Sequence, residues 1–298
     1  MQTTPIPSSL LAPLVPSVHQ APGIRHFLAL TTLGLVLASG GNAARADETT
    51  NASDDPPVQT VPRDGRMGSD RFVRGESTRL KGGHAVAWAI LSRSGKIEEV
   101  GVTISLGVFR TEHEPGDGPL DAIASLEFPR VVREATYFNH CQVHWNPHGH
   151  ASPPSQPERY AVPHFDVHFY SVPEAVVWAI PALPPPLPDV PADLLPAGWQ
   201  QAGPSEPEMG RHSSPDSIAD GPFAADMIAG FLPSGRTMHF IEPMFTPEFL
   251  ARAEDFTMPV PRPQRFGRTM LYPETFSAEY DSKLNAYHFV FRQFGIVE

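Results

Sequence analysis

The amino-acid sequence predicts a mainly β protein, with a single sandwich- or barrel-like domain that carries two or three short helices. Proline is abundant, at 35 of 298 residues, and it interrupts helices because it lacks an amide donor and clashes with the preceding turn. Several segments are rich in β-branched and aromatic residues, or alternate apolar with polar residues, as half-buried strands do. The hydrophobic content of 41% is enough to bury a core.

The N-terminal segment has the features of an export signal. Residues 27–38 form an apolar run that follows Arg25, and an Ala-x-Ala motif ends at Ala46. This order of charge, apolar run and small residues is typical of a secretory signal peptide, here residues 1–46. An uncleaved membrane anchor is the alternative, but the run is shorter than the roughly 20 residues that a spanning helix needs. We therefore expect a periplasmic or secreted protein with no stable membrane insertion after cleavage.

Beyond the expected cleavage site the chain changes character twice. Residues 47–70 are polar, acidic and contain prolines, which predicts a disordered tether. Residues 71–298 form the predicted β-rich, histidine-containing domain. The net charge of −11, without a basic run, excludes nucleic acid as a partner, because phosphate neutralisation dominates that affinity. The partners that we keep are a small-molecule ligand of unknown identity and further copies of the chain in a homo-oligomer.

Within this domain the clearest strand-like segments occur in pairs separated by short polar turns. One hairpin is predicted from residues 84–92 and 100–109, and another from residues 275–280 and 286–294. Further strand candidates are residues 134–145, 164–170 and 236–244.

Two short helices are expected among the strands. Ser171 and Glu174 have capping-box spacing before an apolar run, and Pro247 opens a second helix that runs to about Ala253. Residues 181–207 are rich in proline and are expected to form an extended, polyproline-like connection on the surface. A partner-binding role for this stretch is the alternative, and we favour a spacer.

The strongest chemical signal is a cluster of histidines, which are common metal ligands. Cys141 is the only cysteine, so an intramolecular disulfide is excluded and a metal site must use histidine and carboxylate ligands. Six of the 13 histidines lie close together in the sequence: His140, His144, His148, His150, His164 and His168. Four others are expected to be structural: His84, His113, His239 and His288.

The segment 164–170 determines which histidines can act together. Pro163 and the Phe, Val and Tyr content favour a strand over a helix. Side chains alternate along a strand, so His164, Asp166 and His168 share one face, while the phenylalanines enter the core. His164 and His168 lie about 13 Å apart on a strand and cannot easily bind one ion. Asp166 is therefore pivotal, either as a ligand or as a carboxylate that orients the imidazoles, and it is the candidate catalytic base.

The remaining ligands must come from elsewhere in the chain. His150 ends a tight loop, His212 follows the proline-rich stretch, and Glu242 lies on a strand-like segment. With His164 and His168 they form a candidate site for a transition metal, zinc or iron, because a calcium or magnesium site would need mostly oxygen ligands. The alternative is that these histidines are hydrogen-bonded core or rim residues, or a solvated patch.

Two motifs stand close together in this region. One is Trp145-Asn146-Pro147 with Gly149 and His150, and the other is the block PHFDVHFY, which ends at Tyr170. They resemble the W-N-P-x-G-H and P-H-F-D-F-H-F-Y blocks of the TTHB-type family, a domain of unknown function typified by a sigma-E-regulated protein of Thermus thermophilus. Val167 departs from the family aromatic residue, but this core-facing change leaves the polar face intact.

Two weaker blocks extend the resemblance to roughly residues 80–298. The family pattern M-G-x-H matches Met209 to His212, although Ser213 stands where a tryptophan is often found, and E-P-M-x-T matches Glu242 to Thr246. The resemblance implies an exported, β-rich protein and names no reaction. It strengthens the choice of five of the site residues: His164, Asp166, His168, His212 and Glu242.

Two functional hypotheses follow. The first is a metal-dependent hydrolase or lyase of the cell envelope, in which an open metal position activates water. The second is a non-catalytic, metal-stabilised envelope protein for stress response or binding, in which the ion closes the fold. Three protein ligands beside a cavity would favour chemistry, and four ligands without a pocket would favour a structural ion. A serine hydrolase is disfavoured because there is no G-x-S-x-G motif.

Overall fold

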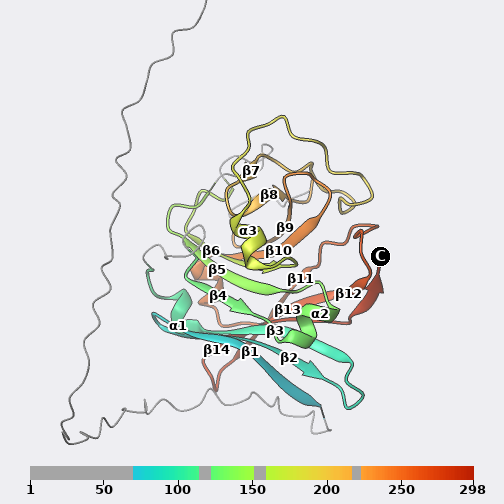
Figure 1. Cartoon of the computed structure of the whole chain (residues 1–298). Helices are drawn as coiled ribbons and strands as arrows, with labels where there is room; N and C mark the ends of the chain where they lie inside the picture. Colours follow the sequence, from blue (N-terminus) through green and yellow to red (C-terminus); the bar gives the residue numbers. More distant parts are fainter. Residues whose placement is uncertain (1–69, 114–121, 151–158, 217–222) are drawn as a thin grey trace, which may run out of the picture. The chain divides into compact units, whose positions relative to one another are not determined.

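The computed structural model describes residues 70–113, 122–150, 159–216 and 223–298 (Figure 1). The predicted signal peptide, residues 1–46, and residues 47–69 of the predicted tether lie outside the described residues. Over the ranges that the structure describes, no helix is both long and apolar enough to cross a membrane.

The described chain is mainly β, as predicted, and its first large sheet has six antiparallel strands in the order β1-β2-β3-β14-β13-β11. Both predicted hairpins belong to this sheet, but the strand expected over residues 100–109 ends at Ser105, because the next four residues are helical. The strands are β1 (Arg71–Leu80), β2 (Gly83–Leu91), β3 (Ile97–Ser105), β11 (Phe256–Pro259), β13 (Thr275–Asp281) and β14 (Ala286–Arg292).

The second large sheet has seven antiparallel strands in the order β4-β5-β6-β10-β9-β8-β7. Its strands are β4 (Ala124–Glu127), β5 (His140–Asn146), β6 (His164–Tyr170), β7 (Ser205–Glu206), β8 (Gly210–Ser213), β9 (Ala225–Phe231) and β10 (Met238–Phe245). A small third sheet pairs β12 (Met270–Tyr272) with β15 (Gly295–Val297).

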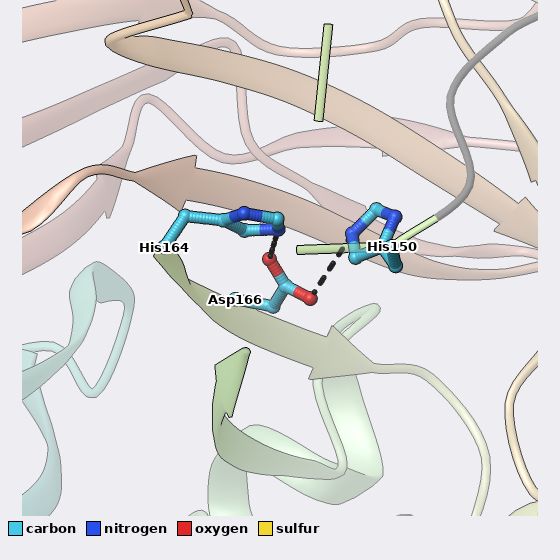
Figure 2. Close-up of side chains that lie close together, drawn as sticks. All are labelled: His150, His164 and Asp166. Carbon is cyan, nitrogen blue, oxygen red and sulfur yellow. Dashed lines mark ion pairs between the residues drawn. The ribbon is translucent and has the colours of Figure 1, made fainter. Parts of the chain in front are cut away.

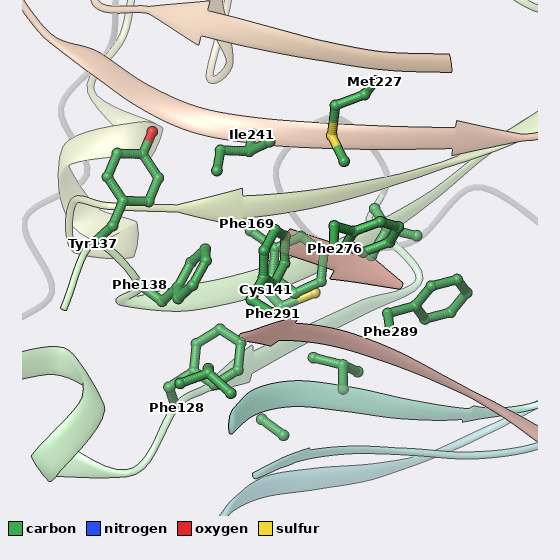
Figure 3. Close-up of a cluster of buried hydrophobic side chains, with 14 of the residues drawn as sticks. Phe128, Tyr137, Phe138, Cys141, Phe169, Met227, Ile241, Phe276, Phe289 and Phe291 are labelled. Carbon is green, nitrogen blue, oxygen red and sulfur yellow. The ribbon is translucent and has the colours of Figure 1, made fainter. Parts of the chain in front are cut away.

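The two large sheets pack face to face over an aromatic core, as in a sandwich (Figure 3). Phe169 of β6 meets Phe291 of β14 with ring centroids 4.8 Å apart, and Phe245 of β10 meets Phe289 of β14 at 5.3 Å. In β6 and β14 alternate residues contribute to this core, which follows from the alternation of side chains along a strand. Burial of these large rings is the main stabilising contribution to the fold.

In the ranges that the structure describes, four short helices join the strands, where two or three were predicted. They are α1 (Leu106–Phe109), α2 (Arg130–Ala135), α3 (Glu174–Trp178) and α4 (Pro247–Leu250). Neither α1 nor α2 was predicted, and because α2 extends to Ala135, the strand expected over residues 134–145 begins only at His140.

The two predicted helices differ in how they begin. In α4 the Thr246 hydroxyl accepts a hydrogen bond from the Phe249 amide at 3.3 Å, so Thr246 caps this helix. The helix ends at Leu250, earlier than Ala253, which has a left-handed φ of 54°. The capping box predicted for α3 is wrong. The Ser171 amide donates to the His239 carbonyl, which keeps Ser171 aligned with the sheet and away from the helix start.

The proline-rich segment, residues 181–207, is anchored more firmly than a spacer requires. Its two ends pair with each other through backbone hydrogen bonds between Leu183 and Ser205. Val190 and Leu194 are buried in the main core. The chain from α3 to β8, yellow in Figure 1, covers the face of the second sheet that points away from the first sheet.

Candidate metal centre

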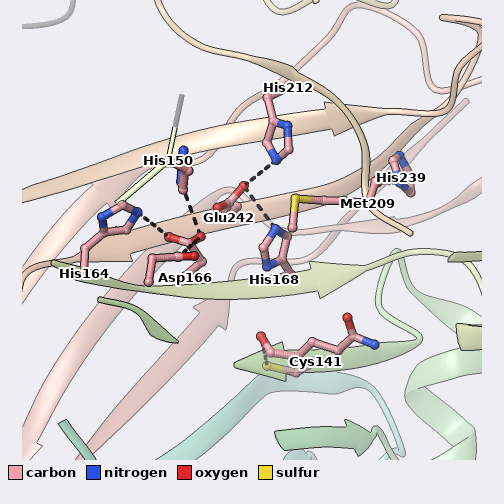
Figure 4. A network of polar contacts seen from close by, with 11 residues as sticks. Cys141, His150, His164, Asp166, His168, Met209, His212, His239 and Glu242 are labelled. Carbon is pink, nitrogen blue, oxygen red and sulfur yellow. Dashed lines mark hydrogen bonds and ion pairs between the residues drawn. The ribbon is translucent and has the colours of Figure 1, made fainter. Parts of the chain in front are cut away.

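The candidate site lies on the outer face of the second sheet, and β6 shows why. The seven residues of β6 are all buried, but they serve two environments. Phe165, Val167 and Phe169 belong to the core between the sheets. His164 and His168 point the other way with Asp166 and lie among polar side chains (Figure 4). The predicted division of the strand into two faces is therefore confirmed.

The first group consists of His150, His164 and Asp166 (Figure 2). Its carboxylate lies between the two rings. Asp166 Oδ1 is 3.1 Å from His164 Nε2, and Asp166 Oδ2 is 3.4 Å from His150 Nε2. The Asn146 amide donates a hydrogen bond of 2.7 Å to Oδ2 from the neighbouring strand β5. This contact from outside the group fixes the orientation of the carboxylate.

The second group consists of His168, His212 and Glu242, from β6, β8 and β10. Both imidazoles point at one oxygen, Glu242 Oε2. His168 Nε2 lies 3.3 Å from it and His212 Nε2 lies 3.6 Å from it. All three strands belong to the second sheet, in which β10 lies beside β6 and β8 lies beyond β9. The sheet therefore brings together residues that are up to 74 positions apart in the sequence.

The hydrogen bonding of His164 fixes Nδ1 as a donor, so that in the neutral ring a lone pair on Nε2 faces the carboxylate. His164 Nδ1 lies 2.7 Å from the Val162 carbonyl oxygen, which can only accept, so Nδ1 carries the proton. In the neutral ring Nε2 is then an acceptor, and it faces Asp166 Oδ1 at 3.1 Å. Neither atom has a hydrogen-bond partner among the described residues. Two acceptors that face each other in a buried site are stabilised by a shared cation, which is either a proton on His164 Nε2 or a metal ion.

The spacing of the ligand atoms also suits a metal ion. Two ligands that are each about 2.1 Å from a tetrahedral zinc ion lie about 3.4 Å from each other. The four nitrogen–oxygen distances in the two groups are between 3.1 and 3.6 Å. Each group supplies two imidazoles and one carboxylate, which is a donor set found in zinc and ferrous iron sites that keep positions open.

Burial keeps the imidazoles of the second group ready to bind. It lowers the pKa of His168 to about 4 and the pKa of His212 well below its ordinary value, so both rings are neutral at neutral pH. Burial also raises the pKa of Glu242, and the nearby Asp166 carboxyl raises it further. Asp166 differs, because His164 and His150 outweigh the effect of burial and hold its pKa well below the ordinary value.

The site is accessible from one side. The side chains of His150 and His212 are 30% and 26% exposed, whereas those of His164, His168 and Glu242 are 0% exposed. The sheet would therefore hold a metal ion bound to these groups from one side. Solvent would reach the ion past the partly exposed rings of His150 and His212.

A cavity of about 550 Å³ is lined by none of the six site residues, but it shares Tyr160 with the surroundings of the first group. Tyr160 connects the two, since it lines the cavity and its ring packs 5.6 Å from that of His150. Trp199, Met258 and several prolines give the cavity an apolar wall, while Arg262 and Asp226 give it charged groups. Its volume is in the range that suits a small-molecule ligand.

The structure brings together all six residues that the sequence predicted: His150, His164, Asp166, His168, His212 and Glu242. It places them in two groups rather than one, with His164 and His168 in different groups. Asn146, which holds Asp166, was missed although it lies on the same face of β5 as His140 and His144. Strand parity alone would have found it. Tyr160 carried no such signal, because the loop that positions it has no regular pattern.

Compared with family models, curated proteins and solved structures, the chain has no significant match. The resemblance to the TTHB-type family therefore stays a prediction.

Proposed function

We propose that this protein is exported to the periplasm or beyond and binds a transition metal, zinc or iron, for a hydrolase or lyase reaction of the cell envelope. One observation carries the proposal: His164 Nε2 and Asp166 Oδ1 face each other at 3.1 Å in a buried site without a hydrogen-bond partner. An ordinary polar core would place a donor between them. A bound metal ion would satisfy both atoms.

Three features support a reactive rather than a closed site. Each group offers three ligands, which leaves room for water in a four-coordinate shell. The exposed rings of His150 and His212 leave a path to solvent. The cavity next to Tyr160 offers space for a substrate. A metal ion bound there would lower the pKa of its water toward about 7. Asp166 would then accept the proton, with its second oxygen oriented by Asn146.

The alternative function is a non-catalytic, metal-stabilised envelope protein for stress response or binding. The burial of Glu242 and His168, both 0% exposed, favours it, since an ion there would join three strands. The two functions differ in the open position. Cobalt substitution tests for an open position. If the cobalt ion holds an exchangeable water, added azide replaces the water and changes the absorption spectrum. If four protein ligands fill the shell, azide leaves the spectrum unchanged.

Elemental analysis tests the metal itself. Purified wild-type protein should contain zinc or iron, and replacement of His164 or His168 with alanine should remove ligands and reduce the content. The matched control is His288→Ala. This histidine is also buried on a strand and lies 3.6 Å from a carboxylate, Asp281, but it is outside both groups. Wild-type protein that is metal-free and does not bind added zinc or iron would refute the proposal.

Export is tested separately. Intact mass of the mature protein should correspond to a chain that begins at Asp47, as cleavage after Ala46 requires. A mass that retains residues 27–46 would contradict the proposed signal peptide.

A further inference from the structure

We infer that the site is binuclear, with one metal position in the first group and a second, adjacent position in the second group. This inference rests on the proposed metal binding and adds the number of ions and the ligands of each. Three observations carry it: the separation of the ligands along β6, the repeated donor set, and the contact between the groups.

One ion cannot use the whole cluster. His164 and His168 lie on the same face of one strand, about 13 Å apart along the backbone. Within each group, the three ligand atoms lie within 4.8 Å of one another. In the part of the chain that the structure describes, no larger set of ligands meets this limit. A single ion would therefore bind one group and leave the other unused.

Without a bound ion, the buried polar atoms of the second group would destabilise the folded state. His168 has no hydrogen-bond partner at either ring nitrogen, and Glu242 has none at either carboxylate oxygen, among the described residues. Both side chains are 0% exposed. Each unsatisfied buried polar group destabilises the folded state. The same argument applies to His164 Nε2 and Asp166 Oδ1 in the first group. Two ions would bind unsatisfied atoms of both groups, whereas one ion would bind those of one group only.

The two groups are side by side on the sheet (Figure 4). Their exposed rings, those of His150 and His212, are stacked with centroids 6.4 Å apart and an interplanar angle of 29°. No salt bridge joins either carboxylate to a lysine or arginine within the described ranges. Each ion would compensate one buried carboxylate, and the pair would present two metals to one substrate, as binuclear hydrolases do.

Equilibrium dialysis against zinc, followed by elemental analysis, counts the ions. Wild-type protein should bind two zinc ions per chain. His150→Ala and His212→Ala should each bind one, and the double variant should bind none. These two histidines are partly exposed, so their replacement leaves the core packed. Circular dichroism of each variant verifies the fold, and His288→Ala should retain two ions.

Manganese loading then tests the proximity of the two ions. The electron paramagnetic resonance spectrum of wild-type protein should show two exchange-coupled ions, while each single variant should show the pattern of an isolated ion. One zinc per chain in the wild type, lost in either single variant, would overturn the binuclear centre and leave the proposed metal binding intact. Failure of the wild type to bind any zinc would overturn both. Two ions without coupling would show that the positions are separate rather than one centre.

Discussion

Replacement of Gly230 with alanine should damage both the fold and the second group. Gly230 lies in β9 opposite Phe240 of β10, and a Cβ atom at this position would lie 1.8–2.3 Å from three atoms of the Phe240 ring. The ring has no free space to move into, because it packs 4.9 Å from His168 and 5.4 Å from Tyr170. Phe240 also packs 5.2 Å from His212, so its displacement would disturb two of the three ligands.

Such overpacking costs about 1–3 kcal/mol. In a domain of this size each kcal/mol lowers the Tm by about 2–4 °C, so the expected decrease is about 2–12 °C. Thermal unfolding followed by circular dichroism measures the decrease, and zinc titration with a competing chelator should show weaker binding at the second group alone. The matched control is Gly203→Ala, since its Cβ would meet nothing closer than the His212 carbonyl oxygen at 4.0 Å. Equal Tm and zinc affinity for the two variants would refute this reasoning.

Three further predictions concern the site and its support. Asn146→Ala removes the 2.7 Å hydrogen bond to Asp166, and zinc affinity measured by chelator competition should fall about 10–100-fold at the first group. Burial lowers the pKa of His140 and of His239 to about 4. Between pH 6.5 and pH 4 the unfolded chain therefore binds protons at these histidines that the folded chain does not bind. The free energy of unfolding should therefore be highest above pH 6.5 and should decrease by about 3 kcal/mol per histidine as the pH falls toward 4. Urea titrations at several pH values measure this decrease. Phe169→Ala empties a fully buried position and should cost about 3–5 kcal/mol in the same assay.

The fold class and the two hairpins could be predicted because their signals are local. Alternation along β6 fixes which side chains face the core, and turn residues such as Gly95, with a φ of 85°, mark the ends of the strands. The short helix α2 gave no such signal, since six residues are too few to show a helical period. Its stability comes from Val132, which is buried in the core, and that contact depends on the rest of the fold.

The members of the site could be predicted, but their grouping could not. The identity of the residues follows from the density of histidines and the strand parity of His164 and Asp166. The partner of each histidine depends on the order of strands in the sheet, which places β10 beside β6 and β8 beyond β9. Such pairing joins segments far apart in the chain, and no local pattern encodes it.

The double role of β6 limits how this protein can change during evolution. From His164 to Phe169, each residue of the strand serves either the core or the metal groups, and the assignment depends on odd or even position. Insertion or deletion of one residue would exchange the two sets, so that imidazoles would enter the core and phenylalanines would replace the ligands. Relatives that share the chemistry should therefore differ in β6 by substitution and keep its length, while changes in length accumulate in the connecting loops.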